Sequence, residues 1–178
     1  MSDSPVRTIV HSDQGDLAFQ HYFVREGCGP KVSGFSFDGI ANAELNPLIR
    51  EWLADCDGVI ICPSNPFVSV DPMLHLDGFG EALKSLPVIA VSPIVGGIAI
   101  KGPAAKMMHE LNMPVTALAV ADHYQGLIDG FVVDQTDAAL VEQFNVPTIS
   151  TPSVMVTLQD RIDLARTCVS FLASLSSN

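Results

Sequence analysis

Residues 58–66 constrain the fold most strongly, because the segment GVIICPSNP is a short apolar run that stops at a corner of proline, serine and asparagine. Four consecutive apolar residues bounded by glycine and proline suit a strand buried on both faces, in the middle of a parallel sheet. The pattern recurs as PVIAVSP at residues 87–93. Because ligand crevices of open α/β sheets lie at the carboxyl ends of the strands, we expect Ser64, Asn65 and Ser92 to line one crevice.

The rest of the chain alternates between strand and helix patterns from residue 43 onward, which indicates a parallel sheet covered on both faces. The segment 116–126 fits a helix or a strand, and we favour a helix. Asp137 is expected to cap the helix that follows the third strand. The predicted strands are 58–61, 87–92, 129–134 and 147–150, and the predicted helices are 43–54, 72–86 (interrupted at 77–78), 103–111, 116–126, 137–144 and 157–172.

The first forty residues show a different pattern. The β-rich runs 6–10 and 17–24 flank a polar turn and predict an antiparallel hairpin, and 32–37 predicts a short edge strand. The expected fold class is therefore α/β: a three-layer, Rossmann-like arrangement with a mostly parallel sheet, helices on both faces and an N-terminal antiparallel hairpin. We expect a single domain over residues 1–178, with a hairpin and edge region at 1–40 and alternating β/α elements at 41–178.

The charge balance excludes a general nucleic-acid surface. Nine Lys and Arg against 20 Asp and Glu give a formal net charge of −11, whereas phosphate neutralisation needs a basic stripe. No apolar run approaches the roughly twenty residues that span a membrane, and the first residues do not resemble a signal peptide. The four cysteines lack metal-site spacing and are expected to be reduced thiols. We therefore expect a cytoplasmic protein without nucleic-acid or membrane partners.

A glycine pair and a lysine follow the second strand and suggest an anion site. Gly96 and Gly97 precede Lys101 and Gly102, and a helix pattern begins at Pro103. A loop followed by a helix N-terminus presents backbone N–H groups to phosphate. Plainer interpretations stay open, because paired glycines also form simple turns and a lysine is often only a solvated cation.

Three linked motifs resemble the 2-phospho-L-lactate transferase family over most of the chain. The first is ICPSNP at 61–66, the second is VSPIVGG at 91–97 with KGPA at 101–104, and the third is His123-Tyr124 with DGF at 129–131. They occur in the family's order and at its separations. Outside the resemblance, His123 and Tyr124 fit a packed, hydrogen-bonded pair and Asp129 fits a strand-end cap.

The resemblance implies an enzyme of coenzyme F-420 biosynthesis. Such an enzyme transfers a phospholactyl or phosphoenolpyruvyl group from a GDP conjugate to the hydroxyl of the deazaflavin Fo, releases GMP and uses Mg²⁺. It implies a homodimer or a pairing with a separate N-terminal half. We expect His123 and Asp129 to be catalytic, with no metal ligand identified, and the following residues to bind substrate or phosphate: Ser64, Asn65, Ser92, Gly96, Gly97, Lys101 and Gly102.

The sequence also departs from the family. It lacks an N-terminal portion with an initial strand, a glycine-rich nucleotide loop and an acidic turn, so we expect a truncated product or one half of a split enzyme. Ile98 replaces a frequent lysine and Asp122 a usual arginine, and both changes weaken anion binding. The alternative function is that of a degenerate, non-catalytic module that binds a nucleotide or a partner.

Overall fold

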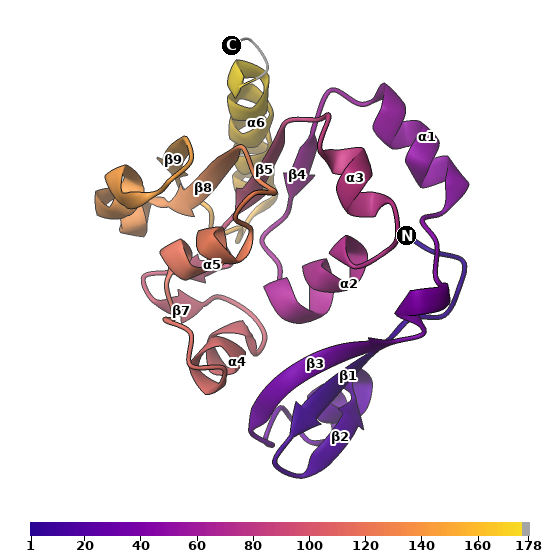
Figure 1. Ribbon diagram of the computed structural model, residues 1–178. Coiled ribbons are helices and arrows are strands. Elements are labelled where there is room, and N and C mark those ends of the chain that lie inside the picture. Colours follow the sequence, from indigo (N-terminus) through magenta and orange to yellow (C-terminus); the bar gives the residue numbers. More distant parts are fainter. Residues whose placement is uncertain (176–178) are drawn as a thin grey trace.

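A four-stranded parallel sheet forms the centre of the computed structural model, which describes residues 1–175 (Figure 1). In spatial order the strands are β4 (Val59–Ile61), β5 (Val88–Val91), β8 (Gly130–Asp134) and β9 (Thr148–Thr151). The strands cross the sheet in their sequence order, and each pairs in parallel with the next. Every residue of β5 and β8 is buried, as expected for central strands.

Helices cover both faces of this sheet, which confirms the predicted three-layer α/β fold. On one face α6 (Leu158–Leu175) buries Leu164, Cys168 and Leu172 against β5 and β8. Within residues 1–175, no helix is both long enough and apolar enough to pass through a bilayer. The opposite face carries α2 (Asp71–Leu74), α3 (Phe79–Leu83), α4 (Ala104–Glu110) and α5 (Ala117–His123).

The position of β4 corrects one expectation. We expected this apolar strand in the middle of the sheet, but among the described residues it pairs only with β5 and forms an edge. Its three residues are half-buried. Apolar residues suit this edge strand because α6 covers one face of β4 and an apolar groove bounded by α2 and α3 lies beside it.

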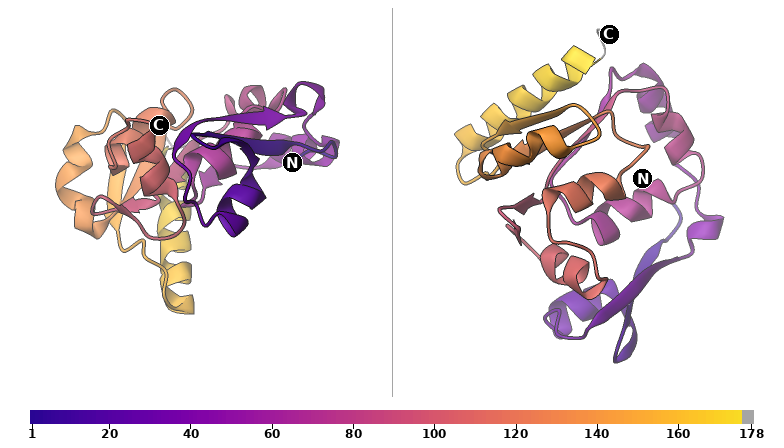
Figure 2. Two further views of the ribbon diagram at one scale, coloured as in Figure 1. Left: turned by 90° about the horizontal axis from the view of Figure 1, so that it is seen from below. Right: turned by 60° about the vertical axis from the view of Figure 1, so that its left-hand side comes forward.

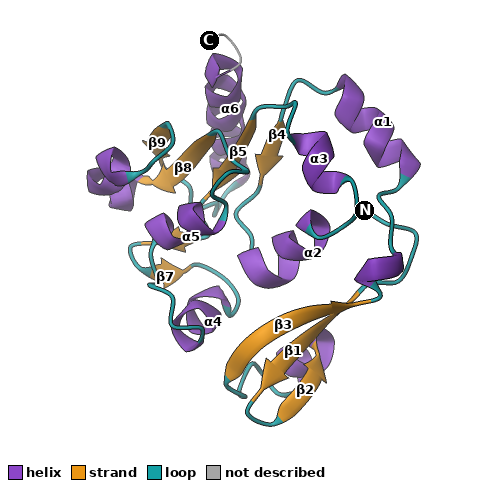
Figure 3. Ribbon diagram, viewed as in Figure 1, coloured by secondary structure: helices purple, strands orange, loops and turns teal. Residues whose placement is uncertain are grey.

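The N-terminal residues form a separate antiparallel sheet, in the order β2-β1-β3 (Figures 2 and 3). The hairpin of β1 (Arg7–Ser12) and β2 (Gly15–Ala18) and the edge strand β3 (Val32–Asp38) confirm the predicted pattern. The second run is shorter than expected, because residues 21–25 form a helical turn that buries Tyr22 completely. One apolar core includes residues of this sheet and of the parallel sheet.

Local capping explains two further differences from the expected elements. The first long helix, α1 (Pro47–Asp55), begins four residues late because Asn46 accepts a hydrogen bond from the Leu48 N–H and Pro47 occupies the first turn. A 3₁₀ helix at Gln135–Gln143 is capped by Asp134 rather than by Asp137. The ambiguous segment 116–126 is helical over Ala117–His123, as favoured, and Thr116 caps this helix.

Thr157 and Asp160 cap the N-terminus of α6 reciprocally. Thr157 Oγ1 accepts a hydrogen bond from the Asp160 N–H at 3.2 Å, and the Asp160 carboxylate accepts one from the Thr157 N–H at 2.7 Å. These two bonds satisfy donors that a helix N-terminus leaves free. The remaining short elements are a 3₁₀ turn (Ile40–Asn42), a π-helical turn (Pro66–Val70), β6 (Ile94–Val95) and β7 (Ile98–Ala99).

Candidate functional site

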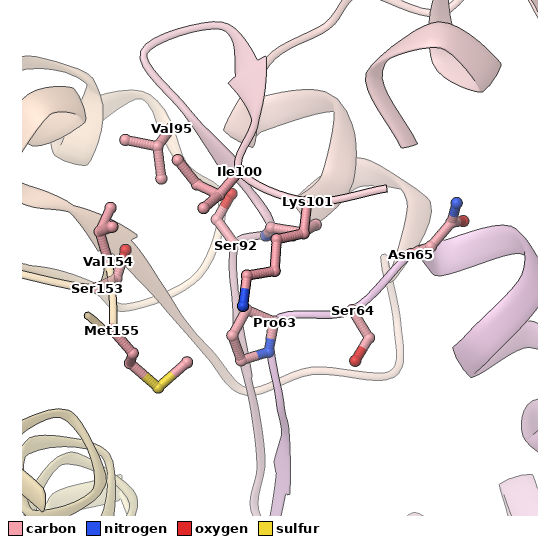
Figure 4. Close-up of a pocket in the computed structure, with 11 residues that line it drawn as sticks. Pro63, Ser64, Asn65, Ser92, Val95, Ile100, Lys101, Ser153, Val154 and Met155 are labelled. Atoms are coloured by element: carbon pink, nitrogen blue, oxygen red, sulfur yellow. The ribbon is translucent and has the colours of Figure 1, made fainter. Parts of the chain in front are cut away.

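A cleft lies at the carboxyl edge of the parallel sheet, where the strand topology predicts a ligand. Its volume is about 120 Å³. Small-molecule sites commonly enclose about 300–1,000 Å³, so this cleft has room for only part of a nucleotide-sized ligand. It is lined by Pro63, Ser64, Asn65, Ser92, Pro93, Val95, Ile100, Lys101, Ser153, Val154 and Met155 (Figure 4).

The corner after β4 supplies one wall of the cleft. Asn65 Oδ1 accepts a hydrogen bond from the Phe67 N–H at 3.0 Å and caps the π-helical turn, while Nδ2 donates to Met107 Sδ at 3.2 Å. The Ser64 hydroxyl makes no hydrogen bond with the described residues. Asn65 therefore shapes the corner, and Ser64 keeps a hydroxyl free to contact a ligand.

Ser92 follows β5 and forms the floor of the cleft. Its hydroxyl donates to the Ile94 carbonyl at 2.8 Å and accepts from the Ile94 N–H at 3.1 Å, and the residue is buried. These bonds form a tight serine turn that ends the strand and directs β6 away from it. Because the Ser92 hydroxyl already donates its proton to the Ile94 carbonyl, it is not free to donate to a ligand. Ser92 therefore acts mainly by holding the backbone of this turn in place.

Lys101 brings the positive charge to the cleft. Its side chain extends into the cleft between Ser64 and the segment of Ser153 and Met155 (Figure 4). It is the only charged residue of the lining, and within residues 1–175 it forms no ion pair. In a chain with a net charge of −11, an uncompensated lysine beside two serines favours an anionic ligand.

The glycine pair predicted to bind phosphate forms a hairpin turn outside the cleft lining. Gly96 and Gly97 have φ values of 57° and 79° and connect β6 to β7. Two consecutive residues with positive φ are typical of a type I′ turn. The Gly96 N–H donates to Asp137 Oδ2 at 2.9 Å, so a carboxylate already occupies the donor that was expected to face phosphate.

Three other positions noted in the sequence are absent from the cleft lining. Gly102 is left-handed at φ 70° and lies beyond the residues that line the cleft. Ile98 is 63% exposed at the hairpin, so a lysine at this position would extend into solvent. Asp122 lies on α5 and is absent from the cleft lining.

The segment after β9 forms a wall of the cleft that the sequence analysis missed. Ser153 is buried, while Val154 and Met155 are 38% and 37% exposed. Together with Val95 and Ile100 they make this side apolar, opposite Ser64. The strand-end rule that selected Ser64 and Ser92 also applies after the predicted strand 147–150 and would have selected this segment.

Asp134, at the carboxyl end of β8, holds that wall in place. Its carboxylate accepts hydrogen bonds from the Ser153 N–H (2.8 Å) and Oγ (3.0 Å) and from the Thr136 N–H (2.9 Å) and Oγ1 (2.7 Å). Burial by itself raises the pKa of Asp134, but these hydrogen bonds outweigh burial and hold the pKa below its usual range. A carboxylate that accepts so many bonds is a rigid anchor rather than a proton carrier.

His123, an expected catalytic residue, lies on the α5 side of the core and is absent from the cleft lining. Its Nε2 lies in hydrogen-bond contact with Asp71 Oδ1 at 2.8 Å, with side chains 23% and 16% exposed. The ring contacts Phe67 and Tyr124 edge-on. These contacts join α5 to α2, and the catalytic role stays a prediction.

Asp129, the other expected catalytic residue, lies at the amino end of β8, whereas the cleft is at the carboxyl end. Its carboxylate accepts a hydrogen bond from the Val88 N–H at 2.8 Å, and its own N–H donates to the Val88 carbonyl at 2.7 Å. These bonds secure the start of β5 beside β8. Nothing in this arrangement brings Asp129 to the cleft, so its catalytic role also stays a prediction.

The residues of the cleft do not fit a magnesium site. Mg²⁺ prefers carboxylate and phosphate oxygens, and no carboxylate lines the cleft. Over residues 1–175 no group of three or more His, Cys, Asp or Glu side chains is arranged to hold a metal ion. The lining of the cleft therefore offers no carboxylate to Mg²⁺, and the use of Mg²⁺ stays a prediction.

Comparisons with solved structures support the fold. The chain is similar to the crystal structure of protein BH3568 from Bacillus halodurans, with a TM-score of 0.61 and 16% sequence identity. The match covers 94% of this chain and 60% of that chain.

Comparisons of sequence indicate the family. Residues 1–160 match the family model described as 2-phospho-L-lactate transferase CofD. The chain is 37% identical over 178 residues to the 2-phospho-L-lactate transferase of Methanococcoides burtonii, covering 98% of this chain and 58% of that protein. It is 36% identical to that of Halobacterium salinarum, covering 99% of this chain and 51% of that protein. The chain thus spans between a half and three fifths of these relatives, and it belongs to the 2-phospho-L-lactate transferase family.

Proposed function

We propose that this chain carries the phosphate-facing part of a site that transfers a phospholactyl or phosphoenolpyruvyl group from its GDP conjugate to the hydroxyl of the deazaflavin Fo. The observation that carries the proposal is the meeting of Ser64, Ser92 and the unpaired Lys101 in one cleft at the carboxyl edge of the sheet. Membership of a transferase family supports the reaction class.

The proposed chemistry suits these residue types. The Fo hydroxyl attacks the β-phosphorus, a new P–O bond forms, the P–O bond to GMP breaks, and the hydroxyl proton passes to solvent. Such a reaction depends mainly on positioning and on neutralising charge on the phosphoryl oxygens. In this proposal the Lys101 ammonium and the Ser64 hydroxyl contact those oxygens, and Val154 and Met155 contact an uncharged part of the substrates.

The size and charge of the cleft support the proposal that other parts of the family's fold complete it. Its volume of about 120 Å³ is small for two substrates, and it lacks the carboxylates that would hold Mg²⁺. A homodimer or a separate N-terminal half would supply the remaining contacts. We therefore expect little transfer by this chain alone.

The test is a GMP-release assay with the GDP conjugate, Fo and Mg²⁺. The chain is mixed with the part of the M. burtonii enzyme that lies outside the match, expressed as a separate polypeptide. We expect GMP release from the mixture, and about 100-fold less with Lys101→Ala, since the variant loses a charge-assisted contact to the phosphoryl group. Lys84→Ala is the control, because Lys84 is an exposed lysine paired with Glu81. The absence of GMP release from the mixture would contradict the proposal.

A non-catalytic nucleotide-binding module is the second candidate. Two observations favour it. The Gly96 N–H donates a hydrogen bond to Asp137 instead of facing a phosphate, and no carboxylate lines the cleft. This function predicts GDP binding by calorimetry, weakened by Lys101→Ala, with no GMP release from any mixture. GMP release from the mixture would exclude it.

A further inference from the structure

A partly buried ion pair joins α4 to the N-terminal sheet. Lys106 Nζ lies 2.7 and 2.8 Å from the two carboxylate oxygens of Glu110. It also donates to the Pro30 carbonyl at 2.8 Å and to the Tyr22 hydroxyl at 3.4 Å. Glu110 in turn accepts a hydrogen bond from the Val32 N–H at 2.9 Å. We call Tyr22, Lys106 and Glu110, with the backbone of Pro30 and Val32, the sheet–helix clamp.

The surroundings of the clamp hold it in one arrangement. Tyr22 is fully buried, and the side chains of Lys106 and Glu110 are 34% and 13% exposed. Burial lowers the pKa of Lys106, but its hydrogen bonds to Glu110 and Tyr22 outweigh burial and raise the pKa above its usual value. Lys106 is therefore charged and paired, and separating it from Glu110 would leave a poorly solvated charge on each side.

Helix α4 depends on such contacts because it is short. It has seven residues, and an isolated helix of that length is unstable in water. Ala104, Met107 and Met108 are buried against the core, while Lys106 and Glu110 lie one helical turn apart and reach the N-terminal sheet. The helix lies between β7 and β3 and contacts both strands (Figure 1). The N-terminal sheet thus helps to set the position of α4.

The first turn of α4 is linked to two residues of the cleft lining. The Met107 N–H donates to the Pro103 carbonyl at 2.9 Å, so this turn begins two residues after Lys101. Met107 Sδ accepts a hydrogen bond from Asn65 Nδ2 at 3.2 Å. Lys101 and Asn65 both line the cleft. A displacement of α4 would therefore move the cation of the cleft and the corner after β4 together.

The two lysines of this region have different roles. Lys101 lines the cleft and has no ion pair with the residues that the structure describes. Lys106 is absent from the lining, and Glu110 compensates its charge. In this arrangement Lys106 has no ammonium hydrogen to offer a ligand of the cleft, because its ammonium donates to three groups of the clamp.

We propose that Lys106 and Glu110 are positioning residues, which fix α4 and thereby set the positions of Lys101 and Asn65 in the cleft. The N-terminal sheet then acts on a cleft to whose lining it contributes no residue. The effect on the shape of the cleft stands by itself. The effect on binding rests on the proposed function, in which Lys101 contacts the phosphoryl oxygens.

The test replaces both members of the ion pair. Lys106→Met with Glu110→Gln removes both charges and nearly preserves both shapes, so that no charge is left unpaired. We expect the Lys101 backbone amide signal and the Asn65 side-chain amide signals to shift in NMR spectra of the ligand-free chain. We also expect about tenfold weaker GDP binding by calorimetry, because the cation is misplaced. Circular dichroism checks the fold.

The matched control is Lys84→Met with Glu81→Gln. It removes the same two charges from an ion pair on α3 whose side chains are 72% and 77% exposed. We expect the Lys101 and Asn65 signals and the affinity for GDP to stay as in the native chain, because an exposed pair contributes little.

Hydrogen exchange of the native chain keeps the test decisive if the double variant of the clamp does not fold. The Val32 amide donates to Glu110, and the Met107 amide closes the first turn of α4. If the clamp joins sheet and helix, both amides open in one event, and we expect their protection to agree within about threefold.

Three results would overturn the proposal. The first is unchanged Lys101 and Asn65 signals, or unchanged GDP affinity, in a folded double variant of the clamp. The second is an equal effect of the control variant. The third is a Val32 amide that exchanges more than about tenfold faster than the Met107 amide, which would show that the sheet opens without α4. Failure of the proposed function gives a different result: the native chain binds no GDP, while the ligand-free signals still shift in the double variant.

Discussion

The carboxyl ends of β8 and of β4 contribute to the same cleft in opposite ways. At the end of β8, the Asp134 carboxylate is buried and accepts four hydrogen bonds from Ser153 and Thr136. Beside the end of β4, Ser64 and Lys101 have no such bonds with the described residues and face the cleft. The comparison indicates that a polar residue satisfied within the fold builds the wall, whereas an unsatisfied one is available to a ligand.

Of the variants compared for stability, Asp134→Ala is expected to cause the largest loss. The variant leaves the buried N–H of Ser153 without an acceptor and releases the 153–155 wall, at a cost of about 3 kcal/mol in the free energy of unfolding. Urea denaturation measures it. Asp163→Ala is the control, because Asp163 is 61% exposed, and it should change stability by less than about 0.5 kcal/mol. Equal effects of the two variants would contradict the anchoring role.

The same anchor predicts a dependence on pH. Hydrogen bonds hold the pKa of Asp134 in the folded state below its usual value, so the stabilisation is present above about pH 4, the ordinary pKa in the unfolded chain, and is lost as pH falls through the folded pKa. The free energy of unfolding of the native chain should therefore fall more steeply with acid than that of Asp134→Asn. Parallel slopes in urea titrations below about pH 4 would contradict the lowered pKa.

His123→Asn is expected to cause the next largest loss of stability. It removes the half-buried pair with Asp71 that joins α5 to α2, and should cost about 1–2 kcal/mol of stability without changing GDP affinity. His11→Asn is the control, because its partner Asp16 is 67% exposed and the pair should contribute less than about 0.5 kcal/mol. A loss of GDP affinity at normal stability would instead place His123 in the binding site.

Ser64→Ala and Lys101→Ala are expected to have the smallest effect on stability. Neither side chain has a hydrogen bond or ion pair with the described residues, so each variant should unfold within about 0.5 kcal/mol of the native chain. Thermal and urea unfolding measure this. A larger loss would show that these side chains are satisfied within the fold, as Asp134 is, and would remove the contrast between the two strand ends.

The layered fold was predictable from the sequence because alternating apolar patterns are local. The edge position of β4 was not, because the apolar run at 59–61 looks the same in the middle of a sheet and beside an apolar groove. The end of β2 at Ala18 was missed for a related reason. Residues 19–24 have β propensity, but burying Tyr22 in the core turns that segment into a helical turn.

The candidate site was predictable where the strand-end rule applied. It placed Ser64, Asn65 and Ser92 beside Lys101, as the structure shows. It did not distinguish the hairpin at Gly96-Gly97 from a phosphate loop, since both use glycines with positive φ. The partner of the Gly96 N–H, Asp137, lies 41 residues away, so no local pattern indicates it.

An NMR titration with GDP tests the central claim most directly, because it locates the anion on the molecule. We predict that the amide signals of Ser64, Ser92, Lys101 and Ser153 shift together on adding GDP, that Lys101→Ala reduces these shifts, and that the signals of Gly96, His123 and Asp129 stay in place. Shifts centred on Gly96, His123 or Asp129, or no shifts at the carboxyl edge of the sheet, would contradict the account.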